Sequence, residues 1–384
     1  MSIKVLQVVV SKNVSGHKSS VTGPERRAAN LASKWKNHDI EVVICYPVSG
    51  SLHSYFYNAG LKVIDFELNG KFDFTAIRKL KEIIIKNNIN LVHTQGAAAL
   101  DLIVSLSAKM SGVPMVVTRP VMICDQIHYS KFRRKIYEII DQNITMKLVN
   151  KVIAVSNLGA SILKKRYSVR KEKITVIHNG VDLNKFLSKQ NILSQSSEEC
   201  EIVIGMVAHL SLFKGWYDFI KTIKQINEKT SKKIKALIIG DGVMRKELEK
   251  EVLRSELDRI ISFTGYHDNI KHLLIQLDIF LFTTHREGLS VAVLEALSSG
   301  LPIVATDIGG IREQVDVEEN GYILKKGDIE GMSQKCLELI HDDNLRCKMG
   351  NKSREIAEKR FSDQRMLQEH INCYKKTLDE FNKK

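Results

Sequence analysis

The feature that most constrains the fold of this chain is an alternation of short apolar runs with longer segments of helix-period apolar residues. In the first half, six runs are expected to form strands, at 5–10, 41–46, 62–65, 91–93, 115–118 and 152–155. Helix-period segments lie between them, at 25–36, 74–87, 98–110 and 132–149. Strands that alternate with helices form a parallel sheet, and the helices cover both of its faces.

A polar stretch at 187–199 interrupts this alternation. The alternation resumes after it, with expected strands at 202–207, 236–239, 260–263, 279–282 and 303–305. A chain of 384 residues is too long for one ordinary core. We therefore expect two α/β domains with doubly wound sheets, residues 1–190 and 200–363, with the helical stretch 364–384 packing back on the first. Such sheets bind ligands at the carboxyl ends of their strands, here in a cleft between the domains.

Charge is unevenly distributed along the chain, whose formal net charge is +14. Residues 1–190 carry 29 Lys and Arg against 13 Asp and Glu, whereas residues 191–384 carry 29 against 31. The basic first half indicates an anionic membrane surface, a phosphorylated acceptor or nucleic acid as a partner, with generic lysine-rich solubility as the alternative. Basic and aromatic residues mix at 131–137 and 164–167, which suits an interfacial helix as well as RNA. We expect no nucleic acid, because no recognised motif supports it.

The sequence also lacks the usual signals of export and metal binding. No small-residue cleavage site follows the first apolar run, and no stretch is long enough to cross a bilayer. The six cysteines show neither a CxxC pair nor zinc-ligand spacing. We expect a cytoplasmic protein with reduced thiols, peripheral at the inner face of the membrane, and no metal site.

Two carboxylates, Glu287 and Glu295, bracket the segment that says most about function. Ser290 is a favourable helix N-cap, Gly300 is favourable just past a helix end, and Pro302 opens a β-branched apolar run. The segment therefore predicts a loop, a short helix and a buried strand. Because helical side chains lean toward the N-terminus, Glu295 can reach the space that Glu287 faces, beside N–H groups that attract phosphate. Two solvated glutamates on a capped helix are the alternative.

Similar segments follow other expected strands. Gly23 precedes Pro24 at a helix start, which either directs free N–H groups at a diphosphate or is a plain proline-led helix start. Lys214 lies at the start of a helix, where the helix dipole disfavours a cation unless an anion lies between the cation and the helix end. Gly265 and Tyr266 follow another strand, and their main chain could pair with the edge of a base. These loops together predict a pocket for a nucleotide-diphosphate sugar.

The combination resembles the retaining glycosyltransferases of family 4, which have the GT-B architecture of two facing Rossmann-like domains. The resemblance covers nearly the whole chain. The motifs that carry it are GPER at 23–26, VIHNGVD at 176–182, HLSLFKG at 209–215, GDG at 240–242, the segment 287–306 and GGIRE at 309–313.

The resemblance implies a role for each residue of the glutamate segment. Glu287 would contact the donor sugar, and Glu295 would hold the ribose. The N–H groups of Gly288, Leu289 and Ser290 would bind phosphate or sugar oxygens. Lys214 would neutralise the diphosphate leaving group, and the main chain of Gly265 and Tyr266 would hold the base.

Two positions depart from the family pattern. His209 stands where relatives commonly have an arginine that binds the diphosphate, so leaving-group stabilisation would be weaker or pH-dependent. Pro120 stands where many relatives have a histidine near the reacting centre. Arg119 could substitute for it in part, and His93 at the end of another strand is a second candidate. A histidine at a strand end is more often a hydrogen-bonded structural residue.

We therefore predict a retaining glycosyltransferase that moves a sugar from a nucleotide-diphosphate sugar to a hydroxyl group, without a metal or cofactor. UDP is the expected nucleotide, with GDP as the alternative. The acceptor would be a glycan or glycolipid in cell-surface polysaccharide, lipopolysaccharide or glycolipid synthesis. The alternatives are a sugar-nucleotide 2-epimerase of the same architecture and a non-catalytic subunit that binds nucleotide sugars.

Overall fold

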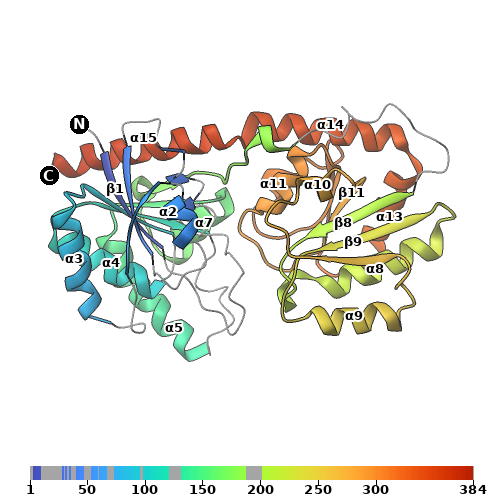
Figure 1. Ribbon diagram of the computed structural model, residues 1–384, viewed down its shortest axis with the longest axis horizontal. Helices are drawn as coiled ribbons and strands as arrows, with labels where there is room; N and C mark the ends of the chain where they lie inside the picture. Colours follow the sequence, from blue (N-terminus) through green and yellow to red (C-terminus); the bar gives the residue numbers. More distant parts are fainter. Residues whose placement is uncertain are drawn as a thin grey trace. The chain divides into compact units, whose positions relative to one another are not determined.

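The computed structural model describes most of the chain in two compact units. The described residues are 3–9, 28–29, 31–32, 34–35, 40–46, 53–58, 60–66, 73–95, 98–120, 131–186 and 201–383. Unit 1 comprises Met1–His178 and Leu367–Lys384, and unit 2 comprises Asn179–Met366 (Figure 1). The predicted polar linker at 187–199 and the predicted anion site at Gly23 lie outside the described residues.

Unit 1 is built on a seven-stranded parallel sheet with the order β3-β2-β1-β4-β5-β6-β7. Its strands are β1 (Ile3–Val8), β2 (Ile40–Cys45), β3 (Lys62–Ile64), β4 (Leu91–Thr94), β5 (Met115–Arg119), β6 (Lys151–Ala154) and β7 (Ile174–Val176). Its longer helices are α3 (Thr75–Lys86), α4 (Ala98–Met110), α5 (Lys131–Ile140), α7 (Asn157–Arg166) and most of α15 (Asp363–Asn382), with α2 (His53–Asn58) shorter. The central strands are buried along their length because helices cover both faces.

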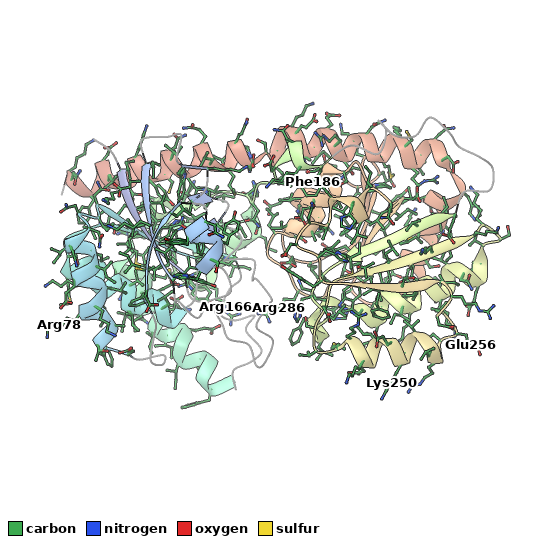
Figure 2. The ribbon with its side chains drawn as sticks, viewed as in Figure 1. Arg78, Arg166, Phe186, Lys250, Glu256 and Arg286 are labelled. Atoms are coloured by element: carbon green, nitrogen blue, oxygen red, sulfur yellow. The ribbon has the colours of Figure 1, made fainter. Side chains whose placement is uncertain are left out.

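Unit 2 repeats this plan with six parallel strands in the order β10-β9-β8-β11-β12-β13. The strands are β8 (Ile202–Val207), β9 (Ile234–Ile239), β10 (Ile261–Gly265), β11 (Ile279–Phe282), β12 (Ile303–Thr306) and β13 (Gly321–Leu324). The helices are α8 (Trp216–Lys229), α9 (Arg245–Arg254), α10 (Lys271–Leu274), α11 (Val291–Ser298), α12 (Ile311–Gln314), α13 (Ile329–His341) and α14 (Asp343–Arg360). Two doubly wound parallel sheets confirm the predicted fold class, and side chains fill the space between sheet and helices in each unit (Figure 2).

Three elements differ from the sequence prediction. β7 and β13 were not predicted, because β7 has three half-buried residues and β13 begins with a glycine that carries no side chain to mark the pattern. The predicted helix at 132–149 is divided into α5, a π-helix η3 (Asp141–Thr145) and the short helix α6 (Met146–Leu148). A π-turn takes up an extra residue, so it changes which side chains face inward.

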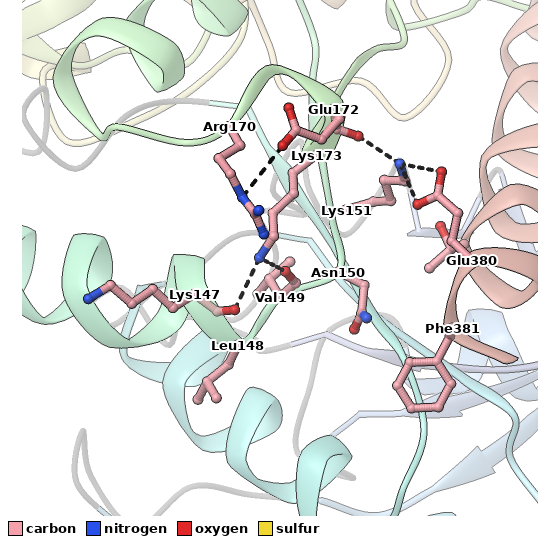
Figure 3. Close-up of a pocket in the computed structure, with 11 residues that line it drawn as sticks. Lys147, Leu148, Val149, Asn150, Lys151, Arg170, Glu172, Lys173, Glu380 and Phe381 are labelled. Atoms are coloured by element: carbon pink, nitrogen blue, oxygen red, sulfur yellow. Dashed lines mark hydrogen bonds and ion pairs between the residues drawn. The ribbon is translucent and has the colours of Figure 1, made fainter. Parts of the chain in front are cut away.

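The C-terminal helix α15 packs on unit 1 through polar as well as aromatic contacts. Lys151, at the amino end of β6, lies 2.9 Å from Glu380 and donates to the carbonyl of Glu172. Lys173 donates to three carbonyls around the end of α6, those of Met146, Lys147 and Val149. Figure 3 shows the contacts of Lys151, and those of Lys173 with the carbonyls of Lys147 and Val149, around a pocket beside α15. The pocket lies at the amino ends of β6 and β7, whereas doubly wound sheets bind ligands at the carboxyl ends.

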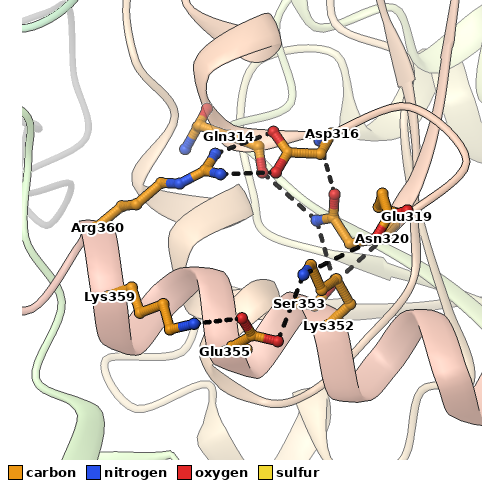
Figure 4. Close-up of polar contacts among 9 residues, drawn as sticks. All are labelled: Gln314, Asp316, Glu319, Asn320, Lys352, Ser353, Glu355, Lys359 and Arg360. Carbon is orange, nitrogen blue, oxygen red and sulfur yellow. Dashed lines mark hydrogen bonds and ion pairs between the residues drawn. The ribbon is translucent and has the colours of Figure 1, made fainter.

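In unit 2, a polar network fixes α14 to the connection between α12 and β13 (Figure 4). Arg360 forms two hydrogen bonds with Asp316, at 2.9 and 2.8 Å. Asn320 accepts from the N–H of Asp316 and donates to Ser353 of α14. Within the described residues, no helix is both long enough and apolar enough to cross a membrane.

Candidate functional site

The candidate site lies where the strand order of unit 2 reverses direction. β8 is the first strand of the unit, and the chain adds β9 and β10 on one side of it before β11 is added on the other. The loops that follow β8 and β11 therefore leave neighbouring strands and turn to opposite faces of the sheet. In doubly wound folds this switch point is the position at which ligands bind.

The loops after β8 and β11 are joined by backbone and side-chain hydrogen bonds. Thr283 donates its hydroxyl to the carbonyl of Gly215, and the N–H of His285 donates to the carbonyl of Phe213. Gly215 has φ +66°, and a Cβ built on it would lie 1.8 Å from the carbonyl oxygen of Thr283. Only glycine fits there, because both the backbone angle and the close approach exclude a side chain.

This junction brings together two residues that the sequence analysis singled out separately. The Nζ of Lys214 lies 2.6 Å from Oε2 of Glu287. Each side chain is 24% exposed, so the pair lies at the surface of the site and is accessible to a ligand. Lys214 ends a short 3-10 helix (Leu212–Lys214) directly before Gly215 and α8, as its predicted place near a helix start requires.

The backbone after Glu287 is held by a second loop, which follows β12. A Cβ on Gly309 would lie 2.0 Å from the carbonyl oxygen of Glu287, and the N–H of Gly310 donates to the carbonyl of Gly288 at 2.6 Å. Asn179 donates its side-chain amide to the carbonyl of Leu289. Within the part of the chain that the structure describes, the N–H groups of Gly288 and Leu289 donate to no protein acceptor. They stay candidates for binding an anion.

Ser290 differs from its prediction as a backbone donor. It is the N-cap of α11, as predicted, and its Oγ accepts from the N–H of Val293. Its own N–H, however, donates to Oε1 of Gln314 at 3.2 Å, and Nε2 of Gln314 donates to the carbonyl of Ser290 at 2.7 Å. The N–H of Ser290 is therefore engaged inside the protein, which corrects the expectation that it contacts the donor.

Gln314 is a site residue that the sequence analysis missed. It lies at the end of α12, is fully buried, and holds the backbone just before α11 through both atoms of its amide. A glutamine in a short helix carries no sequence signal for this role, because its partner is a backbone group 24 residues away. Glu295 lies half-buried in the second turn of α11, as predicted.

A second pair that was missed lies beside Lys214. The Nε2 of His285 is 2.7 Å from Oδ2 of Asp218, on the first turn of α8, and both side chains are partly exposed, as are those of Lys214 and Glu287. The guanidinium of Arg286 lies 6.0 Å from the ring centre of Phe213. These contacts restrict the conformation of the loop 283–287, because each of its residues has a partner in the loop before α8.

The other predicted donor residues lie at the ends of neighbouring strands. His209 is exposed, follows β8, and accepts from the indole N–H of Trp216 through its carbonyl. Gly265 ends β10, and its carbonyl accepts from the N–H of Gly240. Tyr266 is 39% exposed, and its hydroxyl donates to Asp268. All three lie at the carboxyl edge of the same sheet as Lys214.

Arg245 is an additional cation at this edge. Its Nη1 lies 3.5 Å from the position of a Cβ on Gly265, and its guanidinium is 5.8 Å from the ring centre of Phe263. Arg245 donates hydrogen bonds to Glu249 and Asp241, whose carboxylates raise the pKa of Arg245, so the group stays charged. No group of three or more His, Cys, Asp or Glu able to hold a metal ion was found among the described residues.

The structure contradicts a direct role for His93 in unit 1. His93 is fully buried, its Nδ1 lies 2.6 Å from the hydroxyl of Tyr374, and its Nε2 lies 2.8 Å from Oγ1 of Thr118. Both ring nitrogens are therefore used in holding α15 against β4 and β5. The structural alternative fits this histidine, because a group with no exposed surface cannot touch a substrate.

Arg119 is likewise an internal residue, and its predicted catalytic role is corrected. It is 4% exposed and lies 3.0 Å from Asp101 and 2.6 Å from Asp141. Burial raises the pKa of Asp141 to about 6, while the charge of Arg119 acts in the opposite direction. One cation shared by two buried carboxylates is a structural ion triad, which connects β5 with α4 and the π-helix.

Comparisons with known proteins agree across both units. The family model described as glycosyl transferases group 1 matches residues 188–356, and the model described as glycosyltransferase family 4 matches residues 21–185. The chain is 30% identical over 256 residues to the capsular polysaccharide biosynthesis glycosyltransferase CapM of Staphylococcus aureus. The matched region covers 62% of this chain and 65% of that protein.

Two further similarities extend over more of the chain. It is 26% identical over 282 residues to the UDP-Gal:alpha-D-GlcNAc-diphosphoundecaprenol alpha-1,3-galactosyltransferase of Escherichia coli, covering 71% of this chain and 72% of that protein. The crystal structure of Anabaena HepE in complex with UDP superposes with a TM-score of 0.82 at 19% identity, covering 97% of this chain and all of the other. At that identity the likeness concerns the fold.

Proposed function

The chain belongs to the family 4 glycosyltransferases of GT-B fold, and from this premise we propose that it transfers a sugar from a UDP-sugar to a hydroxyl group with retention of anomeric configuration. The names of its relatives place the family members in polysaccharide and glycoconjugate synthesis, and this chain takes part in a pathway of that class. The donor nucleotide, the stereochemistry and the acceptor are the parts that we propose.

The contact between Lys214 and Glu287 carries the proposal. It lies at the switch point of the unit 2 sheet, beside the N–H groups of Gly288 and Leu289. When the bond between the sugar and the diphosphate breaks, negative charge builds on the diphosphate. A lysine ammonium and backbone N–H groups that are already held in place stabilise this charge without reorganising.

The carboxylates then act on the sugar and the nucleotide. Glu287 would accept hydrogen bonds from donor sugar hydroxyls, while its contact with Lys214 holds the ammonium in position. Glu295, half-buried in α11, would accept from the ribose hydroxyls. The acceptor oxygen would attack the anomeric carbon on the face from which the diphosphate leaves, which gives retention, and the proton of the acceptor hydroxyl would pass to the departing diphosphate.

UDP is proposed as the nucleotide, with GDP as the alternative. The HepE structure contains UDP, and the E. coli relative is named for UDP-Gal. In this chain the main chain of Gly265 and the exposed Tyr266 lie at the edge where a base would bind, with Arg245 beside them. We further propose that leaving-group stabilisation by Lys214, with His209 in support, lets transfer proceed without a metal ion or cofactor.

The acceptor is proposed to be a hydroxyl of a glycan or glycolipid. The E. coli relative is named for a sugar attached to diphosphoundecaprenol, a lipid carrier. An acceptor of this kind would be reached by a cytoplasmic enzyme that lies peripherally at the inner face of the membrane. The surplus of positive charge in residues 1–190 supports attraction to such a surface.

The test is to incubate the purified protein with UDP-glucose, UDP-galactose, UDP-N-acetylglucosamine and their GDP counterparts, and to measure nucleotide release with glycolipid acceptors. Proton NMR of the product reports its anomeric configuration. We expect UDP release that depends on acceptor, an α-linked product from an α-linked donor, and no loss of rate with a chelator. Binding of a nucleotide sugar without turnover, or epimerisation of the donor without an acceptor, would refute the proposal.

A further inference from the structure

We propose that an exposed apolar face of α5 and the π-helix after it inserts into the headgroup region of an anionic lipid bilayer. This face, here termed the α5 stripe, consists of Phe132, Ile136, Ile139 and Ile144. The inference deepens the membrane association proposed above and rests on it, since it names the surface that makes the contact.

The four side chains of the α5 stripe are unusually exposed for their size. Phe132 is 74% exposed, Ile136 39%, Ile139 50% and Ile144 44%. The spacing of 132, 136 and 139 places three of them on one side of an α-helix. The π-helix at Asp141–Thr145 holds more residues in a turn, which brings Ile144 toward the same side while Asp141 faces inward. Figure 1 shows α5 at an edge of its unit, remote from α15.

Both acidic residues of this helical segment are paired within the protein. Glu138 lies 3.0 Å from Arg166 at the end of α7, and its side chain is only 14% exposed. Asp141 is buried against Arg119. The negative charges of the segment are thereby turned away from the α5 stripe and neutralised by arginines.

Cations, in contrast, lie exposed around the α5 stripe. Lys135 and Lys147 are exposed on the same helical segment. Lys164 and Lys165 are exposed in the last turn of α7, which adjoins α5 through the contact between Arg166 and Glu138. A row of apolar side chains flanked by lysines matches a bilayer of anionic lipids, which offers phosphate at the surface and acyl chains beneath it.

A lipid surface fits these observations better than a protein partner. A protein interface of this composition would need an apolar groove lined with acidic residues, whereas an anionic bilayer supplies both features over any length. The first half of the chain carries 29 Lys and Arg against 13 Asp and Glu. This positive charge adds to the attraction between the protein and an anionic bilayer. We therefore commit to a membrane of anionic phospholipid as the occupant.

The experiment measures sedimentation of the full chain with vesicles of phosphatidylcholine, with and without phosphatidylglycerol. The double variant Phe132→Ser with Ile139→Ser removes two residues of the α5 stripe. Its matched control is Tyr57→Ser with Phe74→Ser, because these side chains of unit 1 are 70% and 66% exposed but lie elsewhere. We expect the first pair to lower the partition coefficient for anionic vesicles by about tenfold or more, and the control to leave it unchanged.

The charge contribution is tested by Lys135→Glu with Lys147→Glu, against Lys79→Glu with Lys86→Glu on α3. Both pairs change the net charge equally. A larger loss of vesicle binding in the first pair would therefore show that the lysines beside the α5 stripe contribute through their position. Nucleotide release with a water-soluble acceptor is measured for every variant without vesicles. Normal release with lost sedimentation supports the α5 stripe independently of the proposed chemistry.

Three results would overturn the inference. The first is equal loss of sedimentation in the variants and their matched controls. The second is equal binding of wild type to vesicles with and without phosphatidylglycerol. The third is a self-associating wild type that becomes monomeric in the Phe132→Ser, Ile139→Ser variant, which would assign the face to a second copy of the chain.

Discussion

The ammonium group of Lys214 lies 2.6 Å from a carboxylate oxygen of Glu287, although the two residues are 73 positions apart in the chain. They meet because β8 and β11 are neighbours in the sheet of unit 2, so that the loops after these strands run side by side. The cation that we propose for the leaving group and the carboxylate that we propose for the donor sugar therefore form one ion pair, in which each side chain holds the other in place.

Lys214→Ala is expected to lower kcat about 100-fold or more, because the charge that builds on the diphosphate loses its cation. Stability should change by no more than about 1 kcal/mol, since the ion pair is partly exposed. Nucleotide release and thermal melting measure the two effects. Lys352→Ala is the matched control, because it removes a lysine that is 32% exposed in surface ion pairs of α14. A Lys214→Ala enzyme with near-normal kcat would contradict the assignment.

Gly215→Ala is expected to abolish donor binding, because its Cβ would lie 1.8 Å from the carbonyl of Thr283 and would separate the two loops. The matched control is Gly327→Ala in the same unit. Gly327 has φ +78° but no atom within 4 Å of a Cβ, so its substitution tests backbone strain alone, at about 1 kcal/mol. Calorimetric titration with UDP separates the two. Equal UDP affinity in both variants would show that the loop junction does not shape the site.

Gln314→Met is expected to raise the KM for the donor, because the buried N–H of Ser290 loses its partner, its carbonyl keeps only the N–H of Leu294, and the loop before α11 shifts. Leaving this buried N–H unsatisfied should also cost about 1 to 3 kcal/mol of stability. Ser353→Ala, which removes a hydrogen bond farther along the same network, is expected to lower stability with the donor KM unchanged. If the donor KM rose in both variants in proportion to the stability that each loses, Gln314 would have a structural role only.

Asp141 gives a prediction for the pH dependence of stability. Burial raises its pKa in the folded protein to about 6 from 3.8, so between these values the folded state binds more protons than the unfolded state. Stability should therefore fall as pH rises from about 4 through 6, by on the order of 2 kcal/mol from this group. The melting temperature of wild type, relative to Asp141→Asn, should decline over this range. A constant difference across these pH values would show that the carboxyl does not titrate there.

Much of the fold could be read from the sequence because it depends on local pattern. The runs at 202–207 and 279–282 are strands with the predicted bounds, and most others differ by one or two residues. The N-cap at Ser290 and the helix after it were also predicted, since capping depends on neighbouring residues. Parallel strands buried on both faces leave an unbroken apolar run, which identifies them without any knowledge of their neighbours in the sheet.

Side-chain roles at strand ends could not be read in the same way. His93 and Arg119 both end strands, as the pattern indicated, but both are buried among partners that the pattern does not reveal. Tyr374, which holds His93, lies 281 positions away and reaches it only because α15 folds back on unit 1. The sequence alone determined where strands end and which residues stand there. Tertiary structure decided which of those residues meet solvent or ligand and which are enclosed, because burial depends on segments that come together only when the chain is folded.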